Sequence, residues 1–390
     1  MFSERTHWKL AQNRFAQALE QVRGRGAKVL DLTVSNPTRV GLHYEEQTIL
    51  GALASPCSLD YDPQSKGLGE ARAAVARYYR EEHNVSSLDA EQIVLTTSTS
   101  EAYSFVFRLL CNAGDELLVP QPSYPLFEFL ADFEDVRLMP YELIYDHGWL
   151  MDFPSMEKTV TARTRGVVVV HPNNPTGSYV QAGEVEMLNS FCRAHQLAVI
   201  ADEVFLDYRL GSTMYASFAG NREVLTFTLS GLSKIAALPQ MKVAWLVTSG
   251  PAAEAAEALG RLDVIADTYL SMNAPVQWAT PTLLEQRKNI QPQLRERIKA
   301  NLAELDRQLA AQEACQRLGV EGGWNALLRV PVTRSDEELA IELLLENSVL
   351  VHPGHFYDFP SDGYLVLSLI APTQEFAEGV SAVLEKLSGS

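Results

Sequence analysis

The chain has 390 residues, with a hydrophobic share of 46% and a charged share of 21%, values that are typical of globular proteins and exclude a disordered or fibrous one. Its 32 Lys and Arg residues against 49 Asp and Glu residues give a net charge of -17. Such a surface repels nucleic acids and anionic membranes, so we expect neither as a partner.

The N-terminal stretch places Trp8, Phe15, Leu19 and Val22 at roughly helical spacing, which predicts a helix. Charges run through this stretch, so it does not resemble a secretory leader, and no apolar run of the sequence approaches the ~18 residues of a membrane-spanning helix. The cysteines, none of them in a CxxC pair, are Cys57, Cys111, Cys192 and Cys315. We therefore expect a cytoplasmic protein without a disulfide framework or a zinc site.

Between about residues 90 and 250, short β-branched runs alternate with helical stretches. The runs are "QIVLTT", "ELLVPQP", "TRGVVVVHP", "LAVIADEV", "VLTFTLS" and "VAWLVTSG". This alternation predicts an α/β domain with a mostly parallel sheet flanked by helices, because parallel strands need crossover connections and are buried on both faces.

The charge-rich segment 278–315 has a helical stripe and predicts one long helix leading away from that sheet. A second alternation follows it, in "WNALLRVPV", "DEELAIELLLENS", "VLVHPG" and "YLVLSLI". We predict a large domain over 46–280 and a smaller α/β domain over 281–390, which the N-terminal segment 1–45 completes.

Polar residues follow the apolar runs in a regular way. "STSEAY", "SYP", "NNPTG", "DEVF" and "GLSK" each come directly after one of them, and ligands of parallel sheets bind beyond the carboxyl ends of the strands. Taken singly, Ser98 to Ser100 could cap a helix, "NNPTG" could be a turn, Asp202 could be a cap and Lys234 a surface charge. Their coincidence favours one site.

Together these groups match the needs of pyridoxal phosphate: a lysine for the Schiff base, a carboxylate for the ring nitrogen and anion-binding loops for the phosphate. In this order and spacing the sequence resembles the class I/II aminotransferases of fold type I, from "VSNPT" near residue 34 to "LVLSL" near residue 365. The resemblance implies transfer of an amino group from an amino acid or amine to a 2-oxo acid in two half-reactions, with Lys234 as the Schiff-base residue.

The resemblance also implies roles for individual residues. Lys234, Asp202 and Tyr124 would be catalytic: Lys234 forms the aldimine and then moves the proton, Asp202 pairs with the ring nitrogen, and Tyr124 stacks on the ring. The implied cofactor-binding residues are Tyr61, Thr99, Ser100, Glu101, Tyr124, Asn174, Asp202, Val204, Ser230, Ser233, Lys234 and Lys242. Tyr61 would reach the phosphate of the neighbouring subunit's cofactor, which implies a homodimer with shared active sites.

Three positions depart from the family's pattern. Lys242 replaces an arginine that forks onto the phosphate, and a point charge makes one contact in place of two. Phe205 replaces a tyrosine that donates to the phenolic oxygen, a contact for which Tyr208 is a conceivable substitute. Val366 replaces the arginine that clamps the substrate's α-carboxylate. Either another cation takes that role or the substrate has no carboxylate there.

The N-terminal loop of the family lines the substrate pocket, so Ser35 and Arg39 are the expected substrate-binding residues there, with Arg39 as the replacement cation and Arg329 as a weaker candidate. His355 is expected to line the same pocket. His352 and His355 are three residues apart, but no further ligand has usable spacing, so we assign no metal.

Alternative functions remain open from the sequence. The same fold hosts decarboxylation, β-elimination and γ-replacement, and Phe205 and Val366 keep a lyase or decarboxylase in consideration. A non-catalytic protein that binds pyridoxal phosphate is a third possibility. The wording of "GLSK", "PSYPLF" and "HPNNPTG" most resembles the branch that acts on alanine and related amino acids, and no GxGxxG follows a strand, which disfavours a nicotinamide enzyme.

Overall fold

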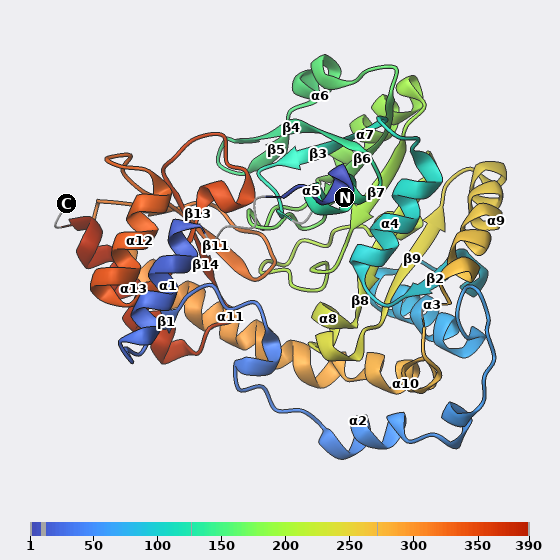
Figure 1. The fold of residues 1–390 in the computed structure, drawn as a ribbon, viewed down its shortest axis with the longest axis horizontal. Coiled ribbons are helices and arrows are strands. Elements are labelled where there is room, and N and C mark those ends of the chain that lie inside the picture. The colour runs from blue at the N-terminus through green and yellow to red at the C-terminus, as the bar shows by residue number, and fades with distance from the viewer. Residues whose placement is uncertain (1, 9–12, 126, 271, 389–390) are drawn as a thin grey trace.

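The structure, a computed structural model, describes residues 2–8, 13–125, 127–270 and 272–388. Its largest element is an eight-stranded sheet in the order β2-β9-β8-β7-β6-β3-β4-β5 (Figure 1). The strands are β2 Ile93–Thr96, β3 Glu116–Gln121, β4 Arg137–Tyr145, β5 Trp149–Met151, β6 Thr164–Val170, β7 Ala198–Asp202, β8 Thr226–Gly231 and β9 Ala244–Ser249. The run from β4 through β3, β6 and β7 to β8 is parallel, and β9, β2 and β5 are antiparallel to their neighbours. The predicted mostly parallel sheet is confirmed.

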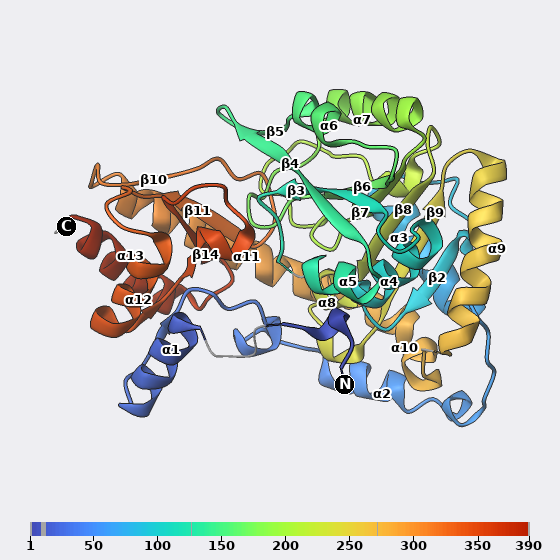
Figure 2. The ribbon, with the colours of Figure 1, turned by 45° about the horizontal axis from the view of Figure 1, so that its top comes forward.

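Helices cover both faces of this sheet. They are α2 Glu46–Leu53, α3 Gly69–His83, α4 Thr99–Leu110, α5 Phe127–Phe133, α6 Phe153–Thr159, α7 Ala182–His195, α8 Leu232–Ile235, α9 Ala252–Tyr269 and α10 Ala274–Glu285. Alternate residues of β6 face opposite cores: Val168 packs with α4, α5 and α9, whereas Val167 packs with α6 and α7. Figure 2 shows α6 and α7 on one side of the strands and α4 and α5 on the other. This period of two is what a strand buried on both faces requires.

A smaller unit contains both ends of the chain. A four-stranded antiparallel sheet has the order β10-β11-β14-β13, and β1 pairs with β12 in parallel. The elements are α1 Arg14–Gly24, β1 Leu30–Asp31, α11 Arg287–Leu309, β10 Gln316–Arg317, β11 Asn325–Arg329, α12 Asp336–Asn347, β12 Val349–Leu350, β13 His352–Pro353, β14 Tyr364–Ser368 and α13 Thr373–Ser388. Phe15 and Val22 of α1 share one hydrophobic core with Leu294 of α11 and Leu343 of α12, and α1 lies beside α12 (Figure 1). This shared core supports the proposed domain boundaries, which stay a prediction.

Two local expectations were wrong. The segment 278–315 forms α10 and α11, which meet at Gln286, and α11 ends at Leu309. The break lies between Pro281 and Pro292, and a proline inside a helix removes one backbone hydrogen bond and crowds the preceding turn. Trp8 lies outside the N-terminal helix, which starts at Arg14 after Asn13 accepts a hydrogen bond from the Ala16 amide.

The ring of Trp8 instead packs edge-on against Phe129 and Phe133 of α5, and its indole donates a hydrogen bond to Asp132. In the ranges that the structure describes, no helix is long and apolar enough to cross a membrane.

Candidate active site

A cavity of about 490 Å³ lies at the carboxyl ends of the parallel strands. Residues that follow β2, β3, β6, β7 and β8 line one part of it, and residues of the smaller unit line the rest. The lining residues that the sequence predicted are Ser35, Thr99, Ser100, Tyr124, Asn174, Asp202, Val204, Ser233 and Lys234. Parallel strands bring their carboxyl ends to one edge of a sheet, which is why motifs far apart in the sequence meet here.

Lys234 on α8 and Asp202 at the end of β7 form the charged centre of the cavity. Burial lowers the pKa of Lys234 from its ordinary value of 10.5 to about 8, and the nearby charge of Asp202 opposes this change. Burial also raises the pKa of Asp202 to about 6, although the Val204 amide and the Tyr103 hydroxyl each donate to its carboxylate at 3.1 Å. The centre therefore combines an amine that loses its proton near neutral pH with a carboxylate that is ionised there.

Two aromatic rings lie next to the Lys234 amine. The Nζ atom of Lys234 lies 4.7 Å from the ring centroid of Trp324 and 5.5 Å from that of Phe205. The two rings meet edge-on, with centroids 5.2 Å apart. Tyr208 donates its hydroxyl to the Lys234 carbonyl oxygen at 2.6 Å and is fully buried. Its hydroxyl thus fixes the backbone of the lysine, so Tyr208 does not substitute for the hydroxyl that Phe205 lacks.

The start of α4 lies at the edge of the cavity. Thr99 and Ser100, its first two residues, line the cavity, and the first amides of a helix lack partners within the helix. Ser98 caps the helix by accepting from the Glu101 amide. The Glu101 carboxylate accepts from the Thr97 amide at 2.7 Å, so it serves the helix start and lies outside the cavity lining.

Two other predicted cofactor contacts also lie away from the cavity lining among the described residues. Ser230 is buried within β8 and donates to the Glu203 carbonyl oxygen at 3.4 Å. Lys242 is exposed and has a backbone φ of +53°. Ser233, the first hydroxyl-bearing residue after Ser230, does line the cavity.

Asn174 and Asn325 join the two parts of the cavity. Asn325, at the start of β11, donates from Nδ2 to Oδ1 of Asn174 at 2.7 Å. Both side chains line the cavity. The amide group of Asn174 is thus oriented by a residue from the smaller unit.

Not all of the residues predicted to bind the substrate line the cavity. Ser35 lines the cavity, whereas Arg39, Arg329 and His355 are exposed and lie outside its described lining. His352, on strand β13, lines it instead and is on the same face of the small sheet as Ser368 of β14, which also lines it.

Val366 itself is 1% exposed in an apolar cluster. Its companions there are Trp149, Leu318, Leu327, Tyr357 and Phe359. No arginine is among the described residues that line the cavity.

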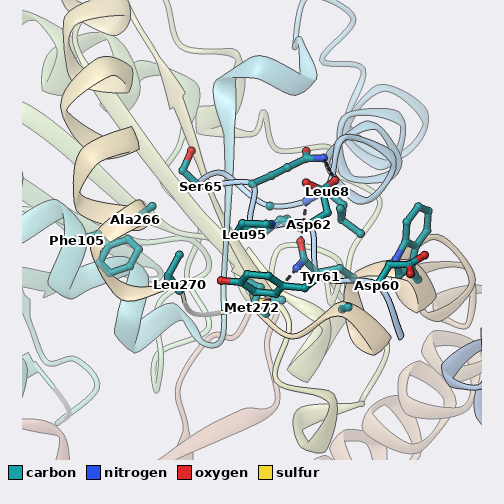
Figure 3. A pocket seen from close by; sticks show the side chains of 16 residues that line it. Asp60, Tyr61, Asp62, Ser65, Leu68, Leu95, Phe105, Ala266, Leu270 and Met272 are labelled. Atoms are coloured by element: carbon teal, nitrogen blue, oxygen red, sulfur yellow. Dashed lines mark hydrogen bonds between the residues drawn. The ribbon is translucent and has the colours of Figure 1, made fainter. Parts of the chain in front are cut away.

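Tyr61 lies in a second hollow, away from Lys234. Its side chain is 79% exposed, and Figure 3 shows it beside Leu270 and Met272 at the end of α9. Within one chain, Tyr61 does not line the Lys234 cavity. No group of three or more His, Cys, Asp or Glu side chains suited to a metal ion occurs in the described part of the chain.

The sequence reasoning did not assign several residues of the site to it, among them Tyr103, Trp324, Asn325 and His352. Tyr103 ends the "STSEAY" motif, and its place one helical turn after Thr99 is a usable signal. Trp324 and Asn325 follow two glycines in "EGGWN". The glycines are a weak signal for a turn, after which side chains can face a site.

Comparisons with known proteins show the family and the fold of the chain. The family model described as aminotransferase class I and II matches residues 52–375. A glutamate-pyruvate aminotransferase of Haemophilus influenzae is 25% identical over 375 residues, covering 93% of this chain and 91% of the relative. An alanine aminotransferase of Mycobacterium tuberculosis is 26% identical over 382 residues, covering 95% and 87%.

Among solved structures, an alanine aminotransferase from Pyrococcus furiosus superposes with a TM-score of 0.88 at 21% identity, covering all of both chains. A Thermus thermophilus aspartate aminotransferase double mutant gives a TM-score of 0.86 at 21% identity over 99% of each chain. These likenesses show the fold. Since the family model covers most of the sequence, the chain belongs to the aminotransferase class I and II family. It is an enzyme that transfers amino groups.

Proposed function

We propose that this aminotransferase holds pyridoxal 5'-phosphate, the cofactor of its family, in the Lys234 cavity. The observation that carries the proposal is the set of donors that share this one cavity: a partly desolvated amine, a carboxylate held by two hydrogen bonds, and the start of a helix. An amine, a pyridinium partner and an anion site are what this cofactor requires. The residues present fit the group.

In the proposed arrangement, Lys234 attaches the cofactor and Asp202 pairs with its ring nitrogen. Thr99, Ser100 and Ser233 hold the phosphate, Tyr124 and Val204 contact the ring, and Asn174 meets the phenolic oxygen. When bound, pyridoxal phosphate supplies a carbonyl group for the substrate amine and an electron sink for the carbon next to it.

The chain's own groups would do the remaining work. Lys234 would be the base that takes a proton on its Nζ atom from the substrate carbon bearing the amino group and holds it for return, and its pKa of about 8 suits a base near neutral pH. Trp324 and Phe205 exclude water from Nζ, which keeps this pKa low. Tyr208 fixes the backbone from which the amine reaches.

The substrates of the proposed reaction are an amino donor and a 2-oxo acid acceptor. Relatives named glutamate-pyruvate and alanine aminotransferase support small amino acids as donors. These relatives and the family match do not favour the lyase or decarboxylase alternative. A cytoplasmic location is part of the proposal, supported by the four free cysteines.

A homodimer with shared active sites completes the proposal. Tyr61 lies outside its own chain's cavity and is 79% exposed, so a second copy could receive its hydroxyl. Large apolar side chains are exposed near it at Leu59 and Leu270, and such groups cluster at subunit contacts.

The test is a single half-reaction. The purified protein, loaded with pyridoxal phosphate, is mixed with one amino donor and no acceptor. We expect up to one equivalent of oxo acid per active site, with neither free ammonia nor carbon dioxide. Repeated turnover without an acceptor, with release of ammonia or carbon dioxide, would instead indicate a lyase or decarboxylase.

A further inference from the structure

Two basic side chains are among the described residues that line the active-site cavity, Lys234 and His352. Lys234 is engaged by the proposed function. A carboxylate that enters the cavity with the amino donor therefore meets one further side chain able to carry positive charge. That side chain is His352.

The small sheet aims His352 at the cavity. On the antiparallel strands β13 and β14, His352 is directly opposite Val366, and Val366 is opposite Leu327 of β11. Directly opposed side chains lie on the same face, about 5 Å apart at Cβ. Ser368, two residues beyond Val366, is on the same face and also lines the cavity. His352 is thus the polar end of an apolar row.

The imidazole is held in place by its neighbours. Its Nδ1 atom is 3.1 Å from the Tyr357 hydroxyl, and its ring lies 5.7 Å from the ring of Phe356 between centroids. The bond to Tyr357 engages Nδ1 and leaves Nε2 as the second nitrogen. A carboxylate would contact Nε2, and no arginine or second lysine competes for it within the described lining.

Burial lowers the pKa of His352 below its ordinary value, and the charge of Asp31 opposes this change. The other titratable groups on elements packed against or next to β13 are Asp336, Glu337, Glu338, Glu342 and Glu346 of α12, His355 and Tyr357 of the 3-10 helix Gly354–Tyr357, Asp358 and Tyr364. Lys234, Asp202 and Tyr124 also line the cavity. At neutral pH the imidazole is therefore uncharged, and a bound anion would favour its protonated form.

We propose that His352 is the specificity residue that receives the carboxylate of the amino donor, taking up a proton as the carboxylate enters. This inference rests on the proposed function and names how that site recognises its substrate. The proton comes from solvent and returns there when the carboxylate leaves. By linkage, affinity for a carboxylate falls about tenfold per pH unit above neutrality, whereas affinity for an uncharged analogue stays constant.

The test measures binding without turnover. The protein loaded with pyridoxal phosphate is titrated by calorimetry with propanoate, which is alanine without its amino group, and with its uncharged amide, propanamide, from pH 6 to pH 8. Buffers of different ionisation enthalpy report the protons taken up. For wild type we expect about one proton per carboxylate at pH 8 and none for the amide.

Two variants of His352 and one matched control test whether His352 is the group that takes up the proton. His352→Asn retains an N–H donor but cannot become charged. We expect this variant to abolish the proton uptake and to lower the affinity for the carboxylate at least tenfold at pH 6, with the affinity for the amide unchanged. His352→Phe should behave alike. His355→Asn changes the exposed imidazole three residues on and should bind as wild type does. Thermal unfolding checks that each variant is folded.

Three results would overturn the inference: no preference of wild type for the carboxylate over the amide at pH 6, unchanged proton uptake in His352→Asn, or equal loss of both ligands in that variant. Steady-state kinetics separate this failure from failure of the proposed function. His352→Asn should raise KM for alanine and leave kcat and the KM for ethylamine within about twofold. If both donors transfer their amino groups equally well in wild type and in the variant, the aminotransferase proposal stands and the role of His352 falls.

Discussion

Replacing Asp202 by Asn is expected to have opposite effects on two properties of the site. Asparagine has the same shape: its Oδ1 can still accept from the Val204 amide, while its Nδ2 can donate to the Tyr103 hydroxyl oxygen, so the fold should survive. What it removes is the negative charge, which raises the pKa of Lys234 and would pair with the cofactor's ring nitrogen.

The first effect concerns capture of the cofactor. With a pKa of about 8, about a tenth of Lys234 is the reactive free amine at pH 7. Loss of the Asp202 charge lowers this pKa, so the free fraction rises, with a ceiling of about tenfold. The rate at which cofactor-free protein takes up pyridoxal phosphate at pH 7, followed by visible absorbance, should therefore rise and lose part of its pH dependence.

The second effect concerns turnover. Two unit charges 4 Å apart at an effective dielectric of 20 attract by about 4 kcal/mol, and a neutral amide recovers only part of this. We expect kcat for amino transfer to fall at least about a hundredfold, which corresponds to about 3 kcal/mol.

Glu203 offers a matched control. It is the next residue, is 1% exposed, and accepts from the Ser217 hydroxyl and the Phe218 amide outside the cavity. Glu203→Gln should keep kcat within about threefold. The reasoning is refuted if Asp202→Asn retains wild-type kcat, or if it captures the cofactor more slowly than wild type while folded.

Two further predictions concern stability and assembly. Burial raises the pKa of Glu203 to about 7, above its ordinary 4.5, so the folded state binds more protons than the unfolded state between these values. The free energy of unfolding should accordingly fall as pH rises from about 5 to 7, by up to about 3 kcal/mol, and urea titrations of Glu203→Gln should show a flatter dependence; an identical slope in both proteins would contradict this. The homodimer should sediment at twice the chain mass of 43.2 kDa. Tyr61→Phe should leave the protein dimeric and lower its affinity for pyridoxal phosphate about tenfold, which is the effect of one lost hydrogen bond to a charged group. A fully active monomer would exclude the shared site.

Sequence reasoning located the half of the cavity that the parallel sheet builds. Asp202, Asn174 and Lys234 each follow an apolar strand, and parallel strands must bring such positions to one edge. Sequence did not distinguish Ser230 from Ser233, because the first lies within β8, a strand buried on both faces, and the second lies in α8. Such a choice depends on a register that only the folded sheet defines.

The other half of the cavity depends on how the smaller unit packs against the sheet. Trp324, in the turn before β11, lies next to Lys234, and Asn325 of β11 donates a hydrogen bond to Asn174. No local sequence pattern predicts these contacts. The two histidines illustrate the same limit. Their spacing of three does not tell which one faces the cavity, whereas the pairing of His352 with Val366 does.

The central claim is that Lys234 holds the cofactor. Its most direct test is borohydride reduction of the yellow, cofactor-loaded protein, followed by mass mapping of its peptides. We predict one reduced pyridoxyl phosphate group per chain, on the peptide that contains Lys234, and none in folded Lys234→Ala. Attachment at another lysine such as Lys242, or full labelling of the Lys234→Ala protein, would contradict the account.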